Sequence, residues 1–112
     1  MLALWHRVTG VDFPPEACLI NYYTPTAKLG LHRDEDEEAR DAPILSLPLG
    51  DTALFRLGGP TRKSPTRSMK LGSGDVVVLE GPSRASFHGV DRILPGTSRL
   101  LAEGGRFNLT LR

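Results

Sequence analysis

Two histidines and one aspartate in this sequence have the types and spacing of a metal site. His32 and Asp34 are separated by a single residue, and in extended backbone side chains two positions apart project to the same side. His88, much further along the chain, could supply a third ligand once a sheet folds back. Two imidazoles and one carboxylate on one face of a metal form the facial triad that leaves positions open on Fe(II). Neutral imidazole and ionised carboxylate suit that ion near neutral pH.

The C-terminal segment adds a second candidate binding feature. Residues 106–112 (RFNLTLR) alternate without exception between polar and apolar side chains. Period two places the polar residues on one face of a strand, and these residues are Arg106, Asn108, Thr110 and Arg112. A half-solvated strand has the same pattern, so the alternation alone does not establish a site. Beside an iron triad, however, the Arg106 guanidinium could bind the distal carboxylate of a dicarboxylate that chelates the metal.

The elements that must position these residues are mostly β-strands. Gly and Pro punctuate the whole chain, and no window after the first few positions keeps a long 3.6-residue apolar period. We expect a helical tail in residues 1–8, with Trp5 as a packing residue and His6 on the surface. Strands are expected at residues 17–23, 44–49, 52–57, 66–71, 75–80, 83–88 and 106–111. So many short strands favour a sandwich or a barrel over βαβ units.

The first expected strand carries two more polar candidates. Asn21 and Tyr23 are again two residues apart, so both can point to one face. From a strand beside the C-terminal one, they could add amide and phenol hydrogen bonds to the same ligand.

Composition bounds the class of protein. The 112 residues predict one domain spanning residues 1–112, and 39% hydrophobic and 24% charged residues are typical of globular domains rather than disordered chains. No apolar run approaches the roughly 20 residues of a membrane span, and no signal pattern precedes the domain, so we expect a cytoplasmic monomer without a membrane partner. Cys18 is the only cysteine, which excludes an intrachain disulfide and favours a buried, reduced thiol.

Charge is segregated along the chain. The net charge of +1 does not by itself attract phosphate backbones. An acidic stretch occupies residues 34–41, and a basic stretch occupies residues 62–70 between Gly and Pro residues. A solvated loop explains either stretch without function, so the segregation becomes informative only beside a catalytic site.

Taken together, these motifs resemble those of the AlkB family of dioxygenases. The matching segments are, in chain order, CLINYY at Cys18, KLGLHRDEDE at Lys28, GDVVV at Gly74, FHG at Phe87 and RFNLTLR at Arg106. His-x-Asp, a distant His and Arg-x-Asn-x-x-x-Arg form a highly specific combination. The match covers nearly all of residues 16–112.

The resemblance implies a double-stranded β-helix (jelly-roll) core with a short N-terminal helical segment. It also implies an enzyme that uses Fe(II), 2-oxoglutarate and O₂. The implied iron ligands are His32, Asp34 and His88. The residues implied to bind 2-oxoglutarate are Arg106, Tyr23 and Asn108 at the distal carboxylate, with Asn21 and Arg112 supporting the end nearer the metal.

The implied reaction is oxidative demethylation of N-alkylated bases, of the 1-methyladenine or 3-methylcytosine type, in DNA or RNA. It couples decarboxylation of 2-oxoglutarate to succinate and CO₂ with release of formaldehyde, and it serves DNA dealkylation repair. A modified base must leave the stack to react, which agrees with single-stranded or flipped-base substrates. Asp36 and Glu37 match acidic positions that could accept a hydrogen bond from an exocyclic amine, and Arg62 matches a position near the lesion.

The chain departs from the family in one respect, and two alternatives stay open. Family members carry roughly a further half-chain upstream, including the lid that grips the nucleotide, so we expect an N-terminally truncated core. One alternative is an Fe(II)/2-oxoglutarate hydroxylase of a protein or small molecule, because the core chemistry does not choose the substrate. The other is an inactive, truncated jelly-roll that binds metal or partners.

Overall fold

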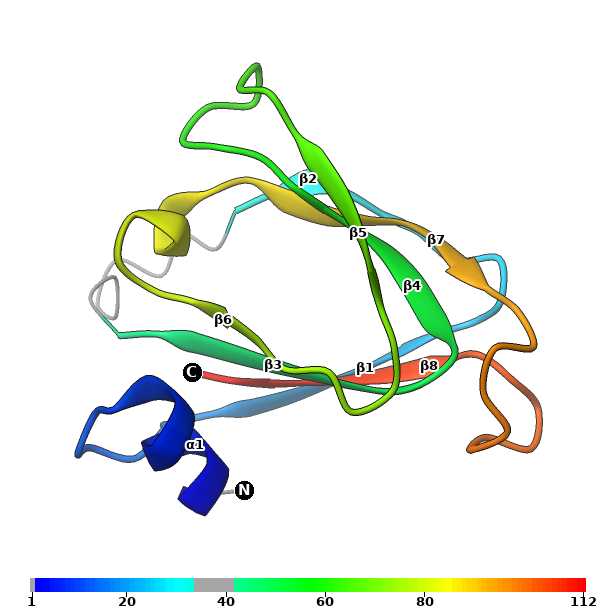
Figure 1. Cartoon of the computed structure of the whole chain (residues 1–112), viewed down its shortest axis with the longest axis horizontal. Helices are drawn as coiled ribbons and strands as arrows, with labels where there is room; N and C mark the ends of the chain where they lie inside the picture. Colours follow the sequence, from blue (N-terminus) through cyan, green and yellow to red (C-terminus); the bar gives the residue numbers. More distant parts are fainter. Residues whose placement is uncertain (1, 34–41) are drawn as a thin grey trace.

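Two antiparallel sheets of four strands face each other in this fold (Figure 1). The computed structural model describes residues 2–33 and 42–112. One sheet has the strand order β1 (Cys18–Tyr23), β8 (Arg106–Leu111), β3 (Ile44–Gly50) and β6 (Val77–Leu79). The other has the order β2 (Leu29–His32), β7 (His88–Leu94), β4 (Thr52–Leu57) and β5 (Arg67–Leu71). The chain passes repeatedly from one sheet to the other, which confirms the expected double-stranded β-helix.

Strand β8 separates polar from apolar residues as its alternation predicts. Its side chains at Arg106, Asn108 and Thr110 line the space between the sheets. Leu111 packs on the opposite face, in a buried cluster with Leu45 of β3. One strand therefore supplies both a polar inner surface and part of the apolar core.

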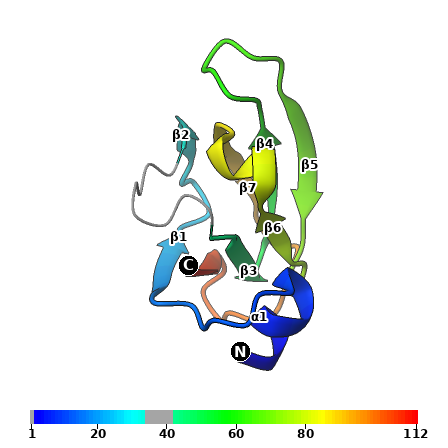
Figure 2. The same cartoon turned by 90° about the vertical axis from the view of Figure 1, so that its left-hand side faces the viewer.

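Helix α1 (Leu2–Thr9) packs against the outer face of the β8-containing sheet (Figure 2). Trp5 is 0% exposed and contacts Leu45 and Leu111, and its indole N–H donates to the carbonyl oxygen of Phe13 over 3.0 Å. The expected packing role of Trp5 is confirmed, and His6 is exposed as expected. In the described part of the chain, no helix has the length and apolar character needed to cross a bilayer.

The expected strand at residues 83–88 is wrong. A 3-10 helix, η2 (Gly81–Ala85), occupies the first half of that segment, and β7 begins rather than ends at His88. Pro82 has no N–H to give to a sheet, and the Ser83 hydroxyl accepts from the Glu80 backbone N–H over 3.0 Å. These local hydrogen bonds compete successfully with strand pairing.

Two further expectations need correction. Strand β2 was not foreseen, because four residues (LGLH) are too few to show an alternating pattern. Cys18 is exposed, so the expectation of a buried thiol is wrong. It begins β1, which lies at the edge of its sheet and therefore has a neighbour on one side only.

Candidate active site

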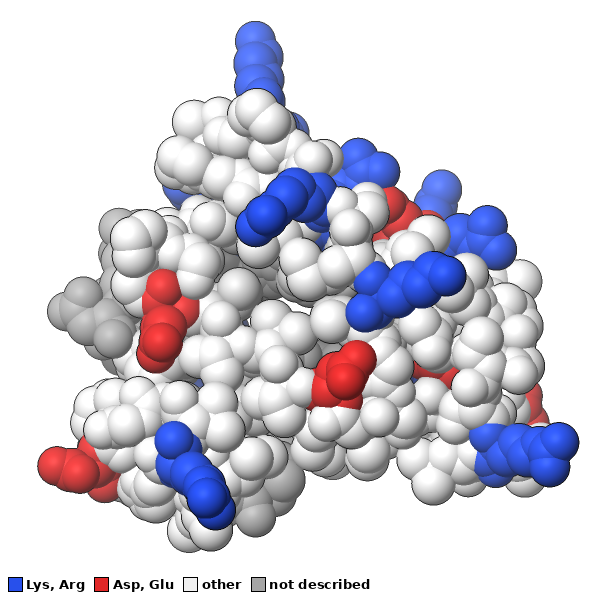
Figure 3. All heavy atoms as spheres, in the orientation of Figure 1, with Lys and Arg blue, Asp and Glu red and all other residues white. Residues whose placement is uncertain are grey.

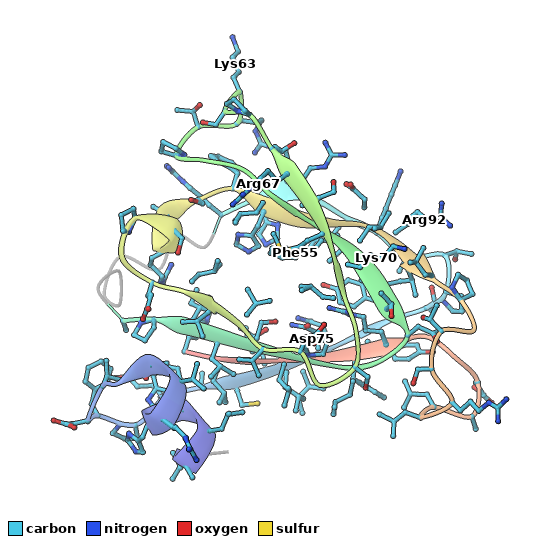
Figure 4. The ribbon with its side chains drawn as sticks, viewed as in Figure 1. Phe55, Lys63, Arg67, Lys70, Asp75 and Arg92 are labelled. Atoms are coloured by element: carbon cyan, nitrogen blue, oxygen red, sulfur yellow. The ribbon has the colours of Figure 1, made fainter. Side chains whose placement is uncertain are left out.

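A cavity of about 150 Å³ lies between the two sheets. Strands β1 and β8, with the residue that follows β8, line it with polar side chains, namely Asn21, Tyr23, Arg106, Asn108 and Arg112. The opposite sheet contributes His32, His88 and an apolar wall that includes Phe55, which points into this space in Figure 4. The fold thus gathers two predicted iron ligands and all five predicted 2-oxoglutarate residues around one cavity.

The two histidines are direct neighbours across strands. His32 at the end of β2 pairs with His88 at the start of β7. Their ring centroids lie 4.5 Å apart, with an angle of 57° between the ring planes. The His88 ring also has an aromatic neighbour, since the ring centroid of Phe55 lies 6.0 Å from it with an angle of 27° between the planes. The two imidazoles are therefore close enough to contact one ion.

Backbone carbonyls orient both imidazoles in the same way. The Nδ1 atom of His32 lies 3.0 Å from the carbonyl oxygen of Gly30, and that of His88 lies 3.0 Å from the carbonyl oxygen of Ser86. A carbonyl oxygen can only accept, so Nδ1 carries the proton in each hydrogen bond. In a neutral ring this leaves the lone pair on Nε2, which is the arrangement that orients metal-binding histidines in proteins.

Arg106 is a buried cation facing the histidines across the cavity. It is 2% exposed, and its Nη1 donates to the carbonyl oxygen of Leu71 over 2.8 Å. Its Nε is also buried and has no hydrogen-bond partner among the described residues. Buried donors are almost always satisfied, so an orphaned guanidinium N–H beside a cavity indicates a missing acceptor. A ligand carboxylate has the charge and the geometry to fill that role.

Tyr23 lies beside Arg106, because the two are register partners of β1 and β8. Burial raises the pKa of the Tyr23 phenol, and the Arg106 charge partly opposes that shift. Burial likewise lowers the pKa of the Arg106 guanidinium, and the nearby Tyr23 and Asp75 oppose this change. At neutral pH the phenol is thus a protonated donor beside a cation.

Asn108 is held within a short polar chain on the same inner face. Its Nδ2 donates to the hydroxyl of Ser46 over 2.7 Å and to the hydroxyl of Thr110 over 3.1 Å. Asn21 is its register partner on β1. The amide is consequently fixed in orientation while it lines the cavity.

One residue that sequence reasoning missed supports this arrangement. Asp51 is 1% exposed, and its carboxylate accepts from the backbone N–H groups of Ser98 over 3.1 Å and of Gly105 over 2.9 Å. Gly105 directly precedes Arg106, so this carboxylate fixes the backbone that presents the guanidinium. In the sequence, Asp51 is marked only by its position after Gly50, and a Gly–Asp pair predicts an ordinary turn.

Four more residues were predicted to belong to the site. Asp34, Asp36 and Glu37 lie outside the described residues. In residues 2–33 and 42–112, no group of three or more His, Cys, Asp or Glu side chains could hold a metal. Arg62 does not line the cavity, and its guanidinium carbon lies 4.9 Å from the ring centroid of Phe87, the residue before His88.

Comparison with known proteins establishes the family. Residues 1–112 match the 2OG-Fe(II) oxygenase superfamily. The chain belongs to this superfamily. The chain is 56% identical over 112 residues to the alpha-ketoglutarate-dependent dioxygenase AlkB homolog of Caulobacter vibrioides, covering 100% of this chain and 51% of that protein. It therefore spans about half the length of this relative.

Two further likenesses agree with that membership. A protein of Arabidopsis thaliana named DNA N(6)-methyladenine demethylase ALKBH1D is 42% identical over 108 residues, covering 88% of this chain and 24% of that protein. The solved structure of OsALKBH1 superposes with a TM-score of 0.82 and 41% identity, covering 91% of this chain and 51% of that chain. The jelly-roll core of the 2OG-Fe(II) oxygenases is thus present in the described residues.

Membership implies Fe(II), 2-oxoglutarate and O₂ as cofactor and co-substrates, and the residues present fit them. His32 and His88 present Nε2 lone pairs from neighbouring positions. The unpartnered Nε of Arg106 offers a directional cationic donor that suits a carboxylate. The donor set therefore matches a metal and a dicarboxylate within one cavity.

Proposed function

We propose that this chain is the catalytic core of an Fe(II)/2-oxoglutarate-dependent dioxygenase that demethylates N-alkylated bases in DNA or RNA. The observation that carries the proposal is the placement of a histidine pair and a buried, partly unpartnered arginine on opposite walls of one cavity. That arrangement accommodates a metal and a dicarboxylate together.

His32, His88 and Asp34 are the proposed iron ligands. The first two would bind through Nε2, because their Nδ1 atoms donate hydrogen bonds to backbone carbonyl oxygens. Asp34 follows β2 by two residues and would complete the facial triad. When bound, iron with O₂ and 2-oxoglutarate supplies the oxidising chemistry, and the overall products are succinate, CO₂, formaldehyde and the unmodified base.

The opposite wall binds and orients the co-substrate in this proposal. Arg106 holds the distal carboxylate of 2-oxoglutarate, with the neutral Tyr23 phenol as a second donor. Asn108 lines the same end, and Asn21 and Arg112 support the end nearer the metal. Donors fixed before binding hold the co-substrate in one orientation without reorganising, which lowers the entropic cost of reaching the reactive geometry.

The proposed substrate is a methylated base that has left the stack, in single-stranded or flipped-base nucleic acid. The name of the Arabidopsis relative supports this substrate class. Asp36, Glu37 and Arg62 are proposed to contact the modified base or its neighbourhood. Monomeric state and cytoplasmic location are also proposals, which light scattering and cell fractionation would test.

A single assay decides among the possible activities. The purified chain would be given Fe(II), 2-oxoglutarate and an oligonucleotide carrying 1-methyladenine or 3-methylcytosine, and succinate and formaldehyde would be measured. Equal amounts of both products support demethylation. Succinate without formaldehyde indicates a hydroxylase with another substrate, and neither product indicates a non-enzymatic binding module.

A further inference from the structure

The β4–β5 hairpin carries a concentrated positive charge. Residues 52–74 contain five basic residues and no acidic residue, although the whole chain has 14 basic and 13 acidic residues. One of the five, Arg56, is already neutralised, because its Nη2 lies 2.8 Å from the Asp91 carboxylate. Of the others, Arg62 and Lys63 lie in the loop between the two strands, and Arg67 and Lys70 lie on β5.

Three of these cations form a row along one edge of the molecule. Lys63 lies at the hairpin tip, and Arg67 and Lys70 follow along β5, as Figure 4 shows. All three are exposed, and none makes an ion pair with another described residue. Figure 3, in the same orientation, shows basic side chains along the edge of the molecule that β5 forms. We call Lys63, Arg67 and Lys70 the β5 row.

The β5 row lies close to the candidate active site. Arg67 pairs with Leu57 of β4, and Leu57 pairs with His88 of β7. Directly paired residues share a sheet face, so Arg67 stands on the cavity side, two strand spacings or about 10 Å from His88. Lys70, three positions further along β5, projects from the opposite face of the strand. Because β5 is the edge strand of its sheet, both side chains border the same exposed edge. If one nucleotide of a nucleic-acid strand placed its base in the cavity, the phosphates of the neighbouring nucleotides would lie within reach of the β5 row.

We propose that the β5 row binds backbone phosphates of the nucleic-acid strand whose modified base occupies the cavity. This inference rests on the proposed function, and it assigns the strand a path along β5. Lysine and arginine contacts to phosphate fix the position of a strand without reading its sequence. Charged residues on an edge strand can also serve to prevent edge-to-edge pairing, and the test below separates that role from phosphate binding.

The test compares two triple variants of equal charge. The row variant is Lys63→Gln, Arg67→Gln and Lys70→Gln. The control variant is Arg7→Gln, Lys28→Gln and Arg99→Gln, which removes three exposed charges away from β5. Lys28 directly precedes β2, at the opposite edge of the same sheet. Fluorescence anisotropy measures binding of an unmodified single-stranded DNA 12-mer over a series of KCl concentrations, and light scattering measures the oligomeric state of each protein.

The row variant should lose roughly tenfold or more in affinity at low salt, and its salt slope should fall by about 2, since each single-strand phosphate contact contributes about 0.7. The control should stay within about twofold of the parent. Equal losses in both variants, or no loss in either, would overturn the proposal. Association of the row variant with unchanged DNA affinity would also overturn it, in favour of edge protection.

A second measurement separates this proposal from the proposed function. Formaldehyde release is compared for a methylated mononucleotide and a methylated 12-mer. The row variant should lose activity on the 12-mer and keep it on the mononucleotide, which spans too little backbone to reach the row. If the parent protein releases formaldehyde from neither, the proposed function fails, whereas the binding comparison still decides the role of the row.

Discussion

His32 and His88 face each other across the β2–β7 pair with their ring centroids 4.5 Å apart. Their positions depend on two strands that are distant in the sequence and on the register between them. If this pair holds the metal, changes to either ring and changes to the strand spacing should have the same functional consequence.

Replacing either histidine should abolish metal-dependent turnover. We expect His32→Ala or His88→Ala to lower succinate formation by at least about 100-fold, because one metal ligand is lost. Calorimetric titration with Mn²⁺ should show the matching loss of metal affinity. His6→Ala, on the exposed side of α1, is the matched control and should behave as the parent. Full activity in either cavity variant would refute the ligand assignment.

The spacing between β2 and β7 can be tested at a glycine. An added Cβ at Gly89 would lie 2.6 Å from the carbonyl oxygen of Leu29, whereas one at Gly30 meets nothing within 4 Å. Gly89→Ala should therefore push β2 away, destabilise the protein by about 1–3 kcal/mol and weaken Mn²⁺ binding. Gly30→Ala should do neither. Urea denaturation and calorimetry measure both effects, and equal behaviour of the two variants would contradict the argument.

Arg106 should control co-substrate binding rather than metal binding. Arg106→Ala removes a charged hydrogen bond, which at about 1.5–3 kcal/mol corresponds to a rise of roughly 10–100-fold in the KM for 2-oxoglutarate. Arg106→Lys keeps the charge but lacks the planar fork, so it should restore only part of the affinity. Mn²⁺ affinity should be unchanged in both. An unaltered KM would count against the proposed role.

Asp51 should stabilise the fold and position Arg106. Asp51→Ala leaves the half-buried N–H group of Ser98 and the buried N–H group of Gly105 without their acceptor, at a cost of about 2–4 kcal/mol. Asp51→Asn retains one acceptor and should cost less. The urea midpoint measures stability, and the KM for 2-oxoglutarate should rise in the folded Asn variant. A folded Asp51→Asn variant with the parent KM for 2-oxoglutarate would refute the proposal that Asp51 positions Arg106.

The buried Tyr23 phenol predicts a specific loss of stability at alkaline pH. Its pKa in the folded protein is raised above the ordinary value of 10.0. The unfolded chain therefore releases this proton first as pH rises, so the contribution of the neutral phenol is fully present below about pH 10 and is lost above it. Tyr23→Phe should lose less stability than the parent between pH 8 and pH 11 in urea denaturation. Parallel losses in the two proteins would contradict the assignment.

Local patterns accounted for much of this protein. The period of two in residues 106–112 determined which face of β8 is polar, and the cavity lining agrees with it. The motif His32-x-Asp34 and the distant His88 indicate a metal site by residue type and spacing alone. These signals can be read from the chain because alternation and short spacings are set by backbone geometry alone.

The tertiary structure decided what depends on long-range pairing. Strand β2 is too short to be recognised from sequence and is defined by its pairing with β7. The start of β7 at His88 was predicted wrongly, because the turn formed around Pro82 and Ser83 was not expected. The role of Asp51 in fixing the backbone before Arg106 depends on hydrogen bonds from Ser98 and Gly105, which are distant from it in the sequence. Register and burial arise from contacts between distant segments, and no short window of sequence contains both partners of such a contact.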